Sequence, residues 1–179
     1  MVKQSSTYEQ QIAKLREHGC TVSDGAFCDE VLSRVSYYRL SAYFLTFKME
    51  DGLYASGTDF NKVFRIYEFD CNLRRLLFSV LEELEIYIRA QLSYYHTQKY
   101  GVVYIGAFSV IPANIPAVDK SAERKLFASI MALRGLYPNE DKWNNELIIA
   151  MSALFDEYSD AILLKHIGFP EDWETIMRK

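Results

Sequence analysis

The sequence predicts an all-α fold, a single helical domain that spans residues 1–179. Half of the residues are apolar and 15% are aromatic, which is enough to build a core and excludes a disordered chain. Apolar residues recur at spacings of three and four along most of the chain, which is the period of an amphipathic helix. The stretch from Phe60 to Tyr100 contains neither glycine nor proline, so it predicts one unusually long central helix.

Capping residues predict two helices before residue 50. The Ser-Ser-Thr run at 5–7 can cap the first helix, which we expect to end at Gly19. Asp24 can cap the second, which runs on into SYYRLSAYF (36–44) with a break near Ser36.

Turn-forming residues predict a short irregular or hairpin segment near 50–58, where two glycines flank Leu53 and Tyr54. Thr58 or Asp59 then caps the long helix. At 1.5 Å per residue this helix would be about 60 Å long. We therefore expect either a helix that projects from the body or a break near residues 70–72.

The uncharged stretch 102–118 contains two prolines in its second half, so we expect a buried loop or an extended segment there. A further helix starts at Asp119 or Ser121 and stops before Tyr137-Pro138. The next starts at Asn139 or Asp141, and Gly168 precedes a last short helical turn.

Charge and cysteine usage restrict the function classes. The net charge of −4 excludes a surface that is basic throughout, so any contact with nucleic acid has to be local. The three cysteines lack a CxxC spacing, and no apolar run is long enough for a bilayer, which favours a cytoplasmic protein. No metal-ligand cluster or phosphate-binding glycine loop occurs, so we expect no metal, no cofactor and no membrane contact.

Three segments carry a specific pattern of residue types. SYYRLSAYF (36–44) is followed by IYEFDCNLRRLLFSVLEELEIYIRAQLSYYHTQKYG (66–101), and HIGFPEDWETI (166–176) lies near the C-terminus. The positions that carry the pattern are Tyr37, Tyr38, Arg39, Leu40, Ser41, Tyr43, Tyr67, Phe69, Asp70, Leu73, Arg74, Leu76, Leu77, Glu85, Arg89, Tyr100 and Gly101. Together they resemble the Abi-like family of bacterial abortive-infection phage-resistance proteins.

This resemblance implies an all-helical, HEPN-like bundle that acts in phage defence or as a toxin of a toxin–antitoxin pair. HEPN ribonucleases use an arginine and a histidine separated by four to six residues, without metal and often in a dimer. The chain departs from the family because it lacks the usual Arg-Asn-x-x-x-His segment after Gly101. RNA, a second copy and an antitoxin are therefore the expected partners, and a catalytically dead short form or a non-catalytic interaction module is the alternative.

The candidate catalytic pair is Arg89 and His96. Residues seven apart on a helix share one face, and Glu85 and Ser93 support the same polar seam. Arg89 would hold a scissile phosphate and His96, with an ordinary pKa of about 6.5, would move the proton of a ribose 2′-hydroxyl. The alternative is structural: Glu85 and Arg89 form a common surface pair, and histidine is favoured near a helix C-terminus.

Tyr37, Tyr38, Arg39 and Arg74 are the candidate RNA-binding residues. Tyrosine rings and guanidinium groups stack on the bases of single-stranded RNA. The alternative is again structural, with the tyrosines in the core and Arg39 paired with a carboxylate such as Asp70.

Overall fold

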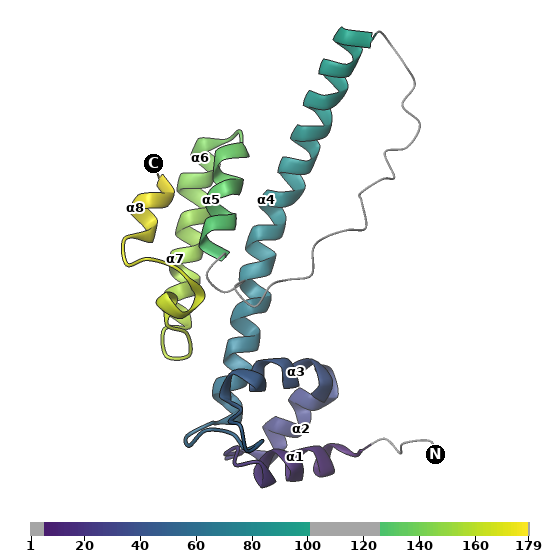
Figure 1. The fold of residues 1–179 in the computed structure, drawn as a ribbon, viewed down its shortest axis with the longest axis vertical. Coiled ribbons are helices and arrows are strands. Elements are labelled where there is room, and N and C mark those ends of the chain that lie inside the picture. Colours follow the sequence, from purple (N-terminus) through teal and green to yellow (C-terminus); the bar gives the residue numbers. More distant parts are fainter. Residues whose placement is uncertain (1–5, 101–125, 179) are drawn as a thin grey trace. The chain divides into compact units, whose positions relative to one another are not determined.

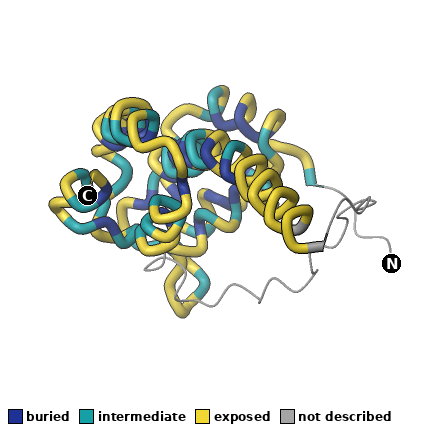
Figure 2. Tube along the Cα trace, turned by 90° about the horizontal axis from the view of Figure 1, so that it is seen from above, coloured by how far each residue is buried: buried dark blue, intermediate teal, exposed yellow. Residues whose placement is uncertain are grey.

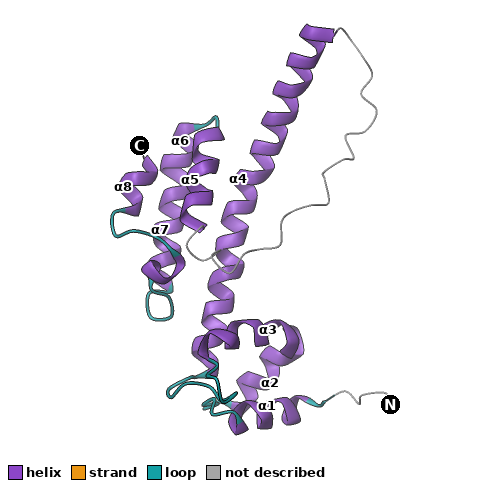
Figure 3. Ribbon diagram, viewed as in Figure 1, coloured by secondary structure: helices purple, strands orange, loops and turns teal. Residues whose placement is uncertain are grey.

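Helices form nearly all of the regular structure in the computed structural model, which describes residues 6–100 and 126–178 (Figures 1 and 3). No strand longer than a single bridge occurs in these ranges, so the predicted all-α fold is confirmed. The predictions for 102–118 and for a helix start at Asp119 or Ser121 lie outside the described residues.

Contacts divide the chain into two compact units, residues 1–72 and 73–179. The boundary falls inside the long helix α4 (Phe60–Tyr100), so both units share this element. The single domain over 1–179 stays a prediction.

Unit 1 contains three short helices that each begin at a residue with a capping side chain. They are α1 (Tyr8–Glu17), α2 (Gly25–Arg34) and α3 (Tyr37–Phe44), and a 3₁₀ turn (Leu45–Phe47) follows. Thr7, Asp24 and Ser36 accept hydrogen bonds from the backbone of the first turns, which satisfies amide groups that a helix start leaves free. The break predicted near Ser36 is therefore confirmed.

The core of unit 1 is built from the inward faces of these helices and the first turns of α4. Its buried apolar residues are Ile12, Leu15, Cys20, Cys28, Val31, Leu32, Leu40, Phe44, Phe60 and Val63. Because they recur at three and four residues, the periodicity in the sequence corresponds to the observed buried faces.

The segment between α3 and α4 is a small hairpin-like turn. Lys48 and Tyr54 form an isolated antiparallel bridge, and the Met49 amide donates to the Leu53 carbonyl at 2.8 Å. The Tyr54 amide donates to the carbonyl of His18 at 2.7 Å, which ties the turn to the end of α1. This agrees with the irregular or hairpin segment predicted near 50–58.

Helix α4 is unbroken over 41 residues, so the long helix is confirmed and the alternative break near 70–72 is wrong. The Asp59 carboxylate accepts from the amides of Asn61 and Lys62 and caps it. Burial along α4 ends at Leu84, which is 4% exposed. Figure 2 shows the exposed colour along the part of the helix that follows.

Unit 2 combines the rest of α4 with the C-terminal helices. These are α5 (Leu126–Leu136), α6 (Glu140–Lys142), a π turn (Trp143–Leu147), α7 (Ile148–Glu157), a 3₁₀ turn (Leu164–Ile167) and α8 (Trp173–Arg178). The Asn139 side chain caps α6, which agrees with the first of the two predicted helix starts, Asn139 or Asp141. Trp143 is fully buried, and its indole N–H donates to the Met177 carbonyl at 3.2 Å.

Candidate functional site

The polar seam of α4 lies on a solvent-exposed part of the helix. Arg89 and Glu85 form an ion pair, and their side chains are 68% and 55% exposed. Ser93, one further turn along, is exposed as well. The side chain of His96 lies outside the described part of the structure, so the seam is described through Glu85, Arg89 and Ser93.

Apolar side chains accompany this seam without being buried. Ile88, Leu92 and Tyr95 are all exposed, whereas Leu84 on the same stripe is in the core. The outer part of α4 therefore presents a guanidinium, a hydroxyl and large apolar groups to solvent.

The SYYRLSAYF segment directs its residues to different surroundings. Leu40 and Phe44 point into the core of unit 1, whereas Tyr38 is 88% exposed. The guanidinium of Arg39 lies 6.0 Å from the centre of the Tyr67 ring, a cation–π distance.

The Asp70 carboxylate accepts a hydrogen bond from the Tyr43 hydroxyl. Asp70 thus contacts a tyrosine of the SYYRLSAYF segment. Arg74, the fourth candidate for RNA binding, is exposed on α4 just inside unit 2. Tyr37, Tyr38 and Arg39 belong to unit 1.

Tyr37 lines a pocket of about 250 Å³ in unit 1. The walls come from the end of α1, one face of α3 and the hairpin-like turn. The lining residues are His18, Tyr37, Ser41, Phe44, Leu45, Lys48 and Tyr54. The pocket therefore combines aromatic walls with a lysine and a histidine, and we call it the Tyr37 pocket.

His18 and Tyr54 contribute polar groups to the Tyr37 pocket. Nδ1 of His18 lies 2.6 Å from the Lys14 carbonyl, which can only accept, so Nδ1 carries a proton and Nε2 is left for another partner. Burial raises the pKa of Tyr54 to about 12, with the neighbouring Tyr37 hydroxyl as a further cause, so this phenol stays neutral at physiological pH.

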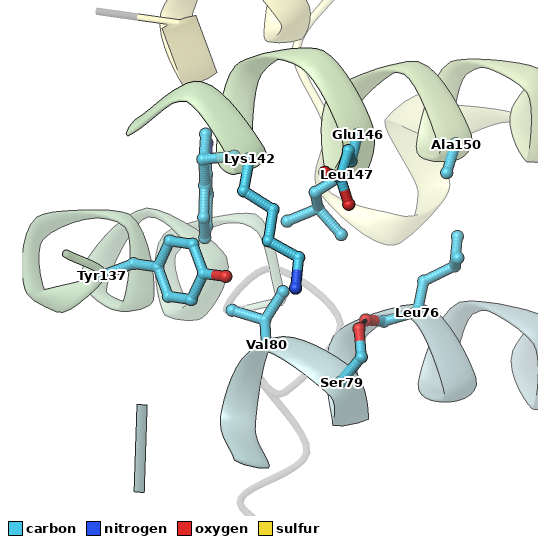
Figure 4. Close-up of a pocket in the computed structure, with 9 residues that line it drawn as sticks. Leu76, Ser79, Val80, Tyr137, Lys142, Glu146, Leu147 and Ala150 are labelled. Carbon is cyan, nitrogen blue, oxygen red and sulfur yellow. Dashed lines mark hydrogen bonds between the residues drawn. The ribbon is translucent and has the colours of Figure 1, made fainter. Parts of the chain in front are cut away.

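A second pocket, of about 200 Å³, lies in unit 2 between α4 and the run from Tyr137 to Ala150 (Figure 4). Leu76, Val80 and Leu147 give it apolar walls, and the Lys142 ammonium extends into it.

Lys142 is already neutralised by Glu83. The Glu83 carboxylate accepts hydrogen bonds from the Lys142 ammonium and from the Tyr137 hydroxyl. These bonds, that of Lys142 first, lower the pKa of Glu83. Glu146 also lines the pocket. Because Glu83 already balances the charge of Lys142, Glu146 gives the pocket a net negative charge.

The described residues contain no group of three or more side chains suited to hold a metal ion. In the same ranges, no helix is both long and apolar enough to cross a membrane. All three cysteines lie in unit 1, and none of them forms a disulfide in the described part of the chain. Burial raises the pKa of Cys20 to about 12 and that of Cys28 to about 11, so both stay protonated and unreactive.

A family model described as Abi-like protein matches residues 30–147, which is more than half of the chain. This chain belongs to the Abi-like protein family. The match covers SYYRLSAYF, all of α4 and the helical run up to the π turn. No curated protein and no solved structure matches the chain.

Membership in the Abi-like family suggests a role in abortive-infection phage defence. The family match includes both candidate sites named from the sequence, since Tyr37–Arg39 and Arg89–His96 fall inside residues 30–147. It also includes Lys48 and Tyr54 of the Tyr37 pocket, but His18 precedes it.

The sequence did not indicate His18, Leu45, Lys48 or Tyr54 as residues of the Tyr37 pocket. The turn chemistry at 50–58 indicated that the chain reverses there, which would place Lys48 and Tyr54 near each other. His18 contacts Tyr54 through a backbone bond and through a ring contact with 6.1 Å between the ring centres, and local patterns do not indicate such long-range contacts.

Proposed function

We propose that this Abi-like protein acts in phage defence by binding single-stranded RNA at the surface that carries Tyr38 and Arg39. The observation that carries this proposal is the 88% exposure of Tyr38 in the first turn of α3. An exposed tyrosine beside an exposed guanidinium is the combination on which an unpaired base stacks.

Local geometry supports a surface role for this pair. Leu40 and Phe44 fix the inward face of α3, which leaves Tyr38 on the outward face with its ring free to stack. The Tyr67 ring beneath the guanidinium of Arg39 orients it without removing it from solvent. The net charge of −4 fits a local contact of this kind rather than a broad basic surface.

The test is the affinity for a fluorescent single-stranded RNA, measured by polarisation. One lost base–tyrosine stack weakens binding by roughly 5- to 150-fold, so we expect a loss of that order in Tyr38→Ala. Tyr8→Ala, which removes an exposed tyrosine from α1, is the matched control and should bind as the unaltered protein does. Equal affinities for the two variants would contradict the proposal.

A second candidate function is metal-independent RNA cleavage at Arg89 and His96. Its support is the exposure of Arg89 and Ser93 on one helix face, together with the resemblance to HEPN ribonucleases. Arg89 would hold the phosphate and stabilise its developing charge, and His96 would take the proton of the attacking 2′-hydroxyl. The bond from phosphorus to the 5′-oxygen of the next nucleotide would break, and this oxygen would leave with a proton from water or from the protonated His96, which yields a 2′,3′-cyclic phosphate. The chain would then be an endoribonuclease rather than a binding module.

Cleavage of a labelled RNA in excess EDTA tests this candidate. We expect His96→Ala to lower the rate by about 100-fold or more, and Arg89→Ala to lower it as well. Thr97→Ala, on the same exposed stretch, is the control. Full activity in His96→Ala would reject this site. If the unaltered protein cleaves no RNA, the cleavage proposal is wrong and RNA binding remains as the proposed function.

We further propose that the chain associates with a second copy of itself and with an antitoxin. The compartment that we propose is the cytoplasm. The exposed Ile88, Leu92 and Tyr95 support self-association through α4, because burying them removes apolar surface from water. Sedimentation velocity at several concentrations should show a dimer that Leu92→Glu dissociates. A concentration-independent monomer would overturn the second copy.

A further inference from the structure

We propose that the Tyr37 pocket binds a nucleotide, with the base against its aromatic walls and the phosphate at Lys48 and His18. This inference rests on the proposed RNA binding and deepens it, because it places one nucleotide next to the exposed Tyr38.

The walls suit a flat aromatic group. Phe44 lines the pocket and is buried, and its ring centre lies 5.1 Å from that of Tyr54. Tyr37 is partly exposed and Leu45 is exposed, and both line the pocket as well. A base in this pocket would therefore contact aromatic rings and apolar surface, which provide most of the affinity in small-ligand pockets.

The charge of the pocket suits a phosphate. Lys48 forms no ion pair with any residue that the structure describes, and no carboxylate lines the pocket. His18 has Nε2 left over, because its Nδ1 is bound to the Lys14 carbonyl. The pocket of unit 2 differs in this respect, since Glu83 already neutralises Lys142 there.

Ser41 adds a group that can read a base edge. Its hydroxyl donates to the Tyr38 carbonyl at 2.7 Å, so the oxygen is oriented and its lone pairs can accept from a base amino group. Ser41 lies one helical turn after Tyr37, on the same face of α3. Tyr37, Ser41 and Phe44 of the SYYRLSAYF segment thus line the pocket, while Tyr38 is exposed to solvent.

The pocket is held in shape by backbone bonds rather than by a ligand. The Lys48–Tyr54 bridge closes the hairpin-like turn, and the bond from the Tyr54 amide to the His18 carbonyl joins this turn to the end of α1. Preformed walls reduce the ordering cost of binding, so a small nucleotide needs few contacts for measurable affinity.

The experiment is calorimetric titration with AMP, UMP and adenosine, together with polarisation of RNA that carries a 5′-phosphate or a 5′-hydroxyl. Lys48→Met keeps the aliphatic stem and removes the charge, and we expect it to weaken AMP binding by roughly tenfold. Lys62→Met, an exposed lysine on the first turns of α4, is the matched control. Adenosine should bind more weakly than AMP.

Each outcome decides between sources of the nucleotide. Binding of free AMP and UMP with no preference for either RNA end identifies a mononucleotide site. Tighter binding of 5′-phosphorylated RNA, lost in Lys48→Met, identifies an RNA terminus. Equal binding of adenosine and AMP, or equal effects of Lys48→Met and Lys62→Met, overturns the pocket.

Failure of the pocket and failure of the proposed function differ in their results. If Tyr38→Ala weakens RNA binding and Lys48→Met does not, the pocket is wrong and RNA binding stands. If AMP binds through Lys48 but no RNA binds, the pocket stands as a free-nucleotide site and the proposed function is wrong.

Discussion

Glu83 accepts hydrogen bonds from two other parts of unit 2. Its carboxylate accepts from Tyr137, at the end of α5, and from Lys142, in α6, so one side chain of α4 holds two other elements. Burial, followed by the bond to Glu83, raises the pKa of Tyr137, which therefore remains a donor at every physiological pH. The bond to Glu83 likewise raises the pKa of Lys142.

Glu83→Gln should make the free energy of unfolding depend less on pH in the acid range. The folded-state pKa of Glu83 is below its unfolded value, so the stabilisation is complete above about pH 4.3 and disappears as the pH falls through the folded-state pKa. We expect the variant to be less stable than the unaltered protein at about pH 7, and this difference to shrink towards about pH 3. Urea unfolding followed by tryptophan fluorescence measures it. A difference that is constant with pH would show that the carboxylate charge contributes nothing.

The candidate site residues differ in how far the sequence could predict them. Residue type is the basis on which the sequence indicates Tyr37, Tyr38 and Arg39, and the structure exposes Tyr38 to solvent. Which of two neighbouring tyrosines faces a pocket depends on how Leu40 and Phe44 pack, and the sequence pattern does not specify that. For Arg89, the pairing with Glu85 followed from spacing, because both partners lie on one helix.

Helix α4 shows how one element can be buried along part of its length and exposed along the rest. Leu84 is in the core, whereas Leu92, two turns later, is 55% exposed on the same stripe. Because helical stability in proteins comes mainly from packing, the two leucines should contribute unequally although their sequence surroundings are alike.

Leu84→Ala and Leu92→Ala form a matched pair for this gradient. We expect Leu84→Ala to lower the free energy of unfolding by about 2–5 kcal/mol, which is the usual cost of replacing a buried leucine by alanine. Leu92→Ala should change it by less than about 0.5 kcal/mol, measured on dilute protein by urea unfolding. Equal losses would mean that the outer part of α4 is covered.

Local contacts explain why most elements were predictable. Thr7, Asp24, Ser36 and Asn139 each cap a helix by bonding an amide three residues ahead, so the sequence contains both partners. The π turn was not predictable from such contacts. It accompanies a bond from Trp143 to the Met177 carbonyl, 34 residues away, which no local pattern contains.

At the scale of the whole molecule, two compact units share one continuous helix. Both tryptophans of the sequence, Trp143 and Trp173, are buried in unit 2, so their fluorescence reports on that unit alone. Far-UV circular dichroism reports on the helices of both units. The two signals can therefore separate unit 1 from unit 2 during unfolding.

Val31→Ala is the variant that tests whether the units unfold independently. Val31 is fully buried in the core of unit 1, so the change should cost about 2–3 kcal/mol there. We expect the circular dichroism transition in urea to begin earlier while the tryptophan transition stays in place. If both transitions move together, the chain unfolds as one cooperative domain, as the sequence predicted.

The π turn at Trp143–Leu147 has a consequence for changes in chain length. An α-helix rotates by about 100° per residue, so removing one residue normally turns everything beyond it to a new face. A π turn contains one residue more than its span of α-helix needs, so a deletion there returns the helix to regular geometry. Loss of the exposed Asn145 should therefore leave Trp143 and Met151 on their present faces. The run 140–157 is a place where this chain can shorten by one residue and keep its core.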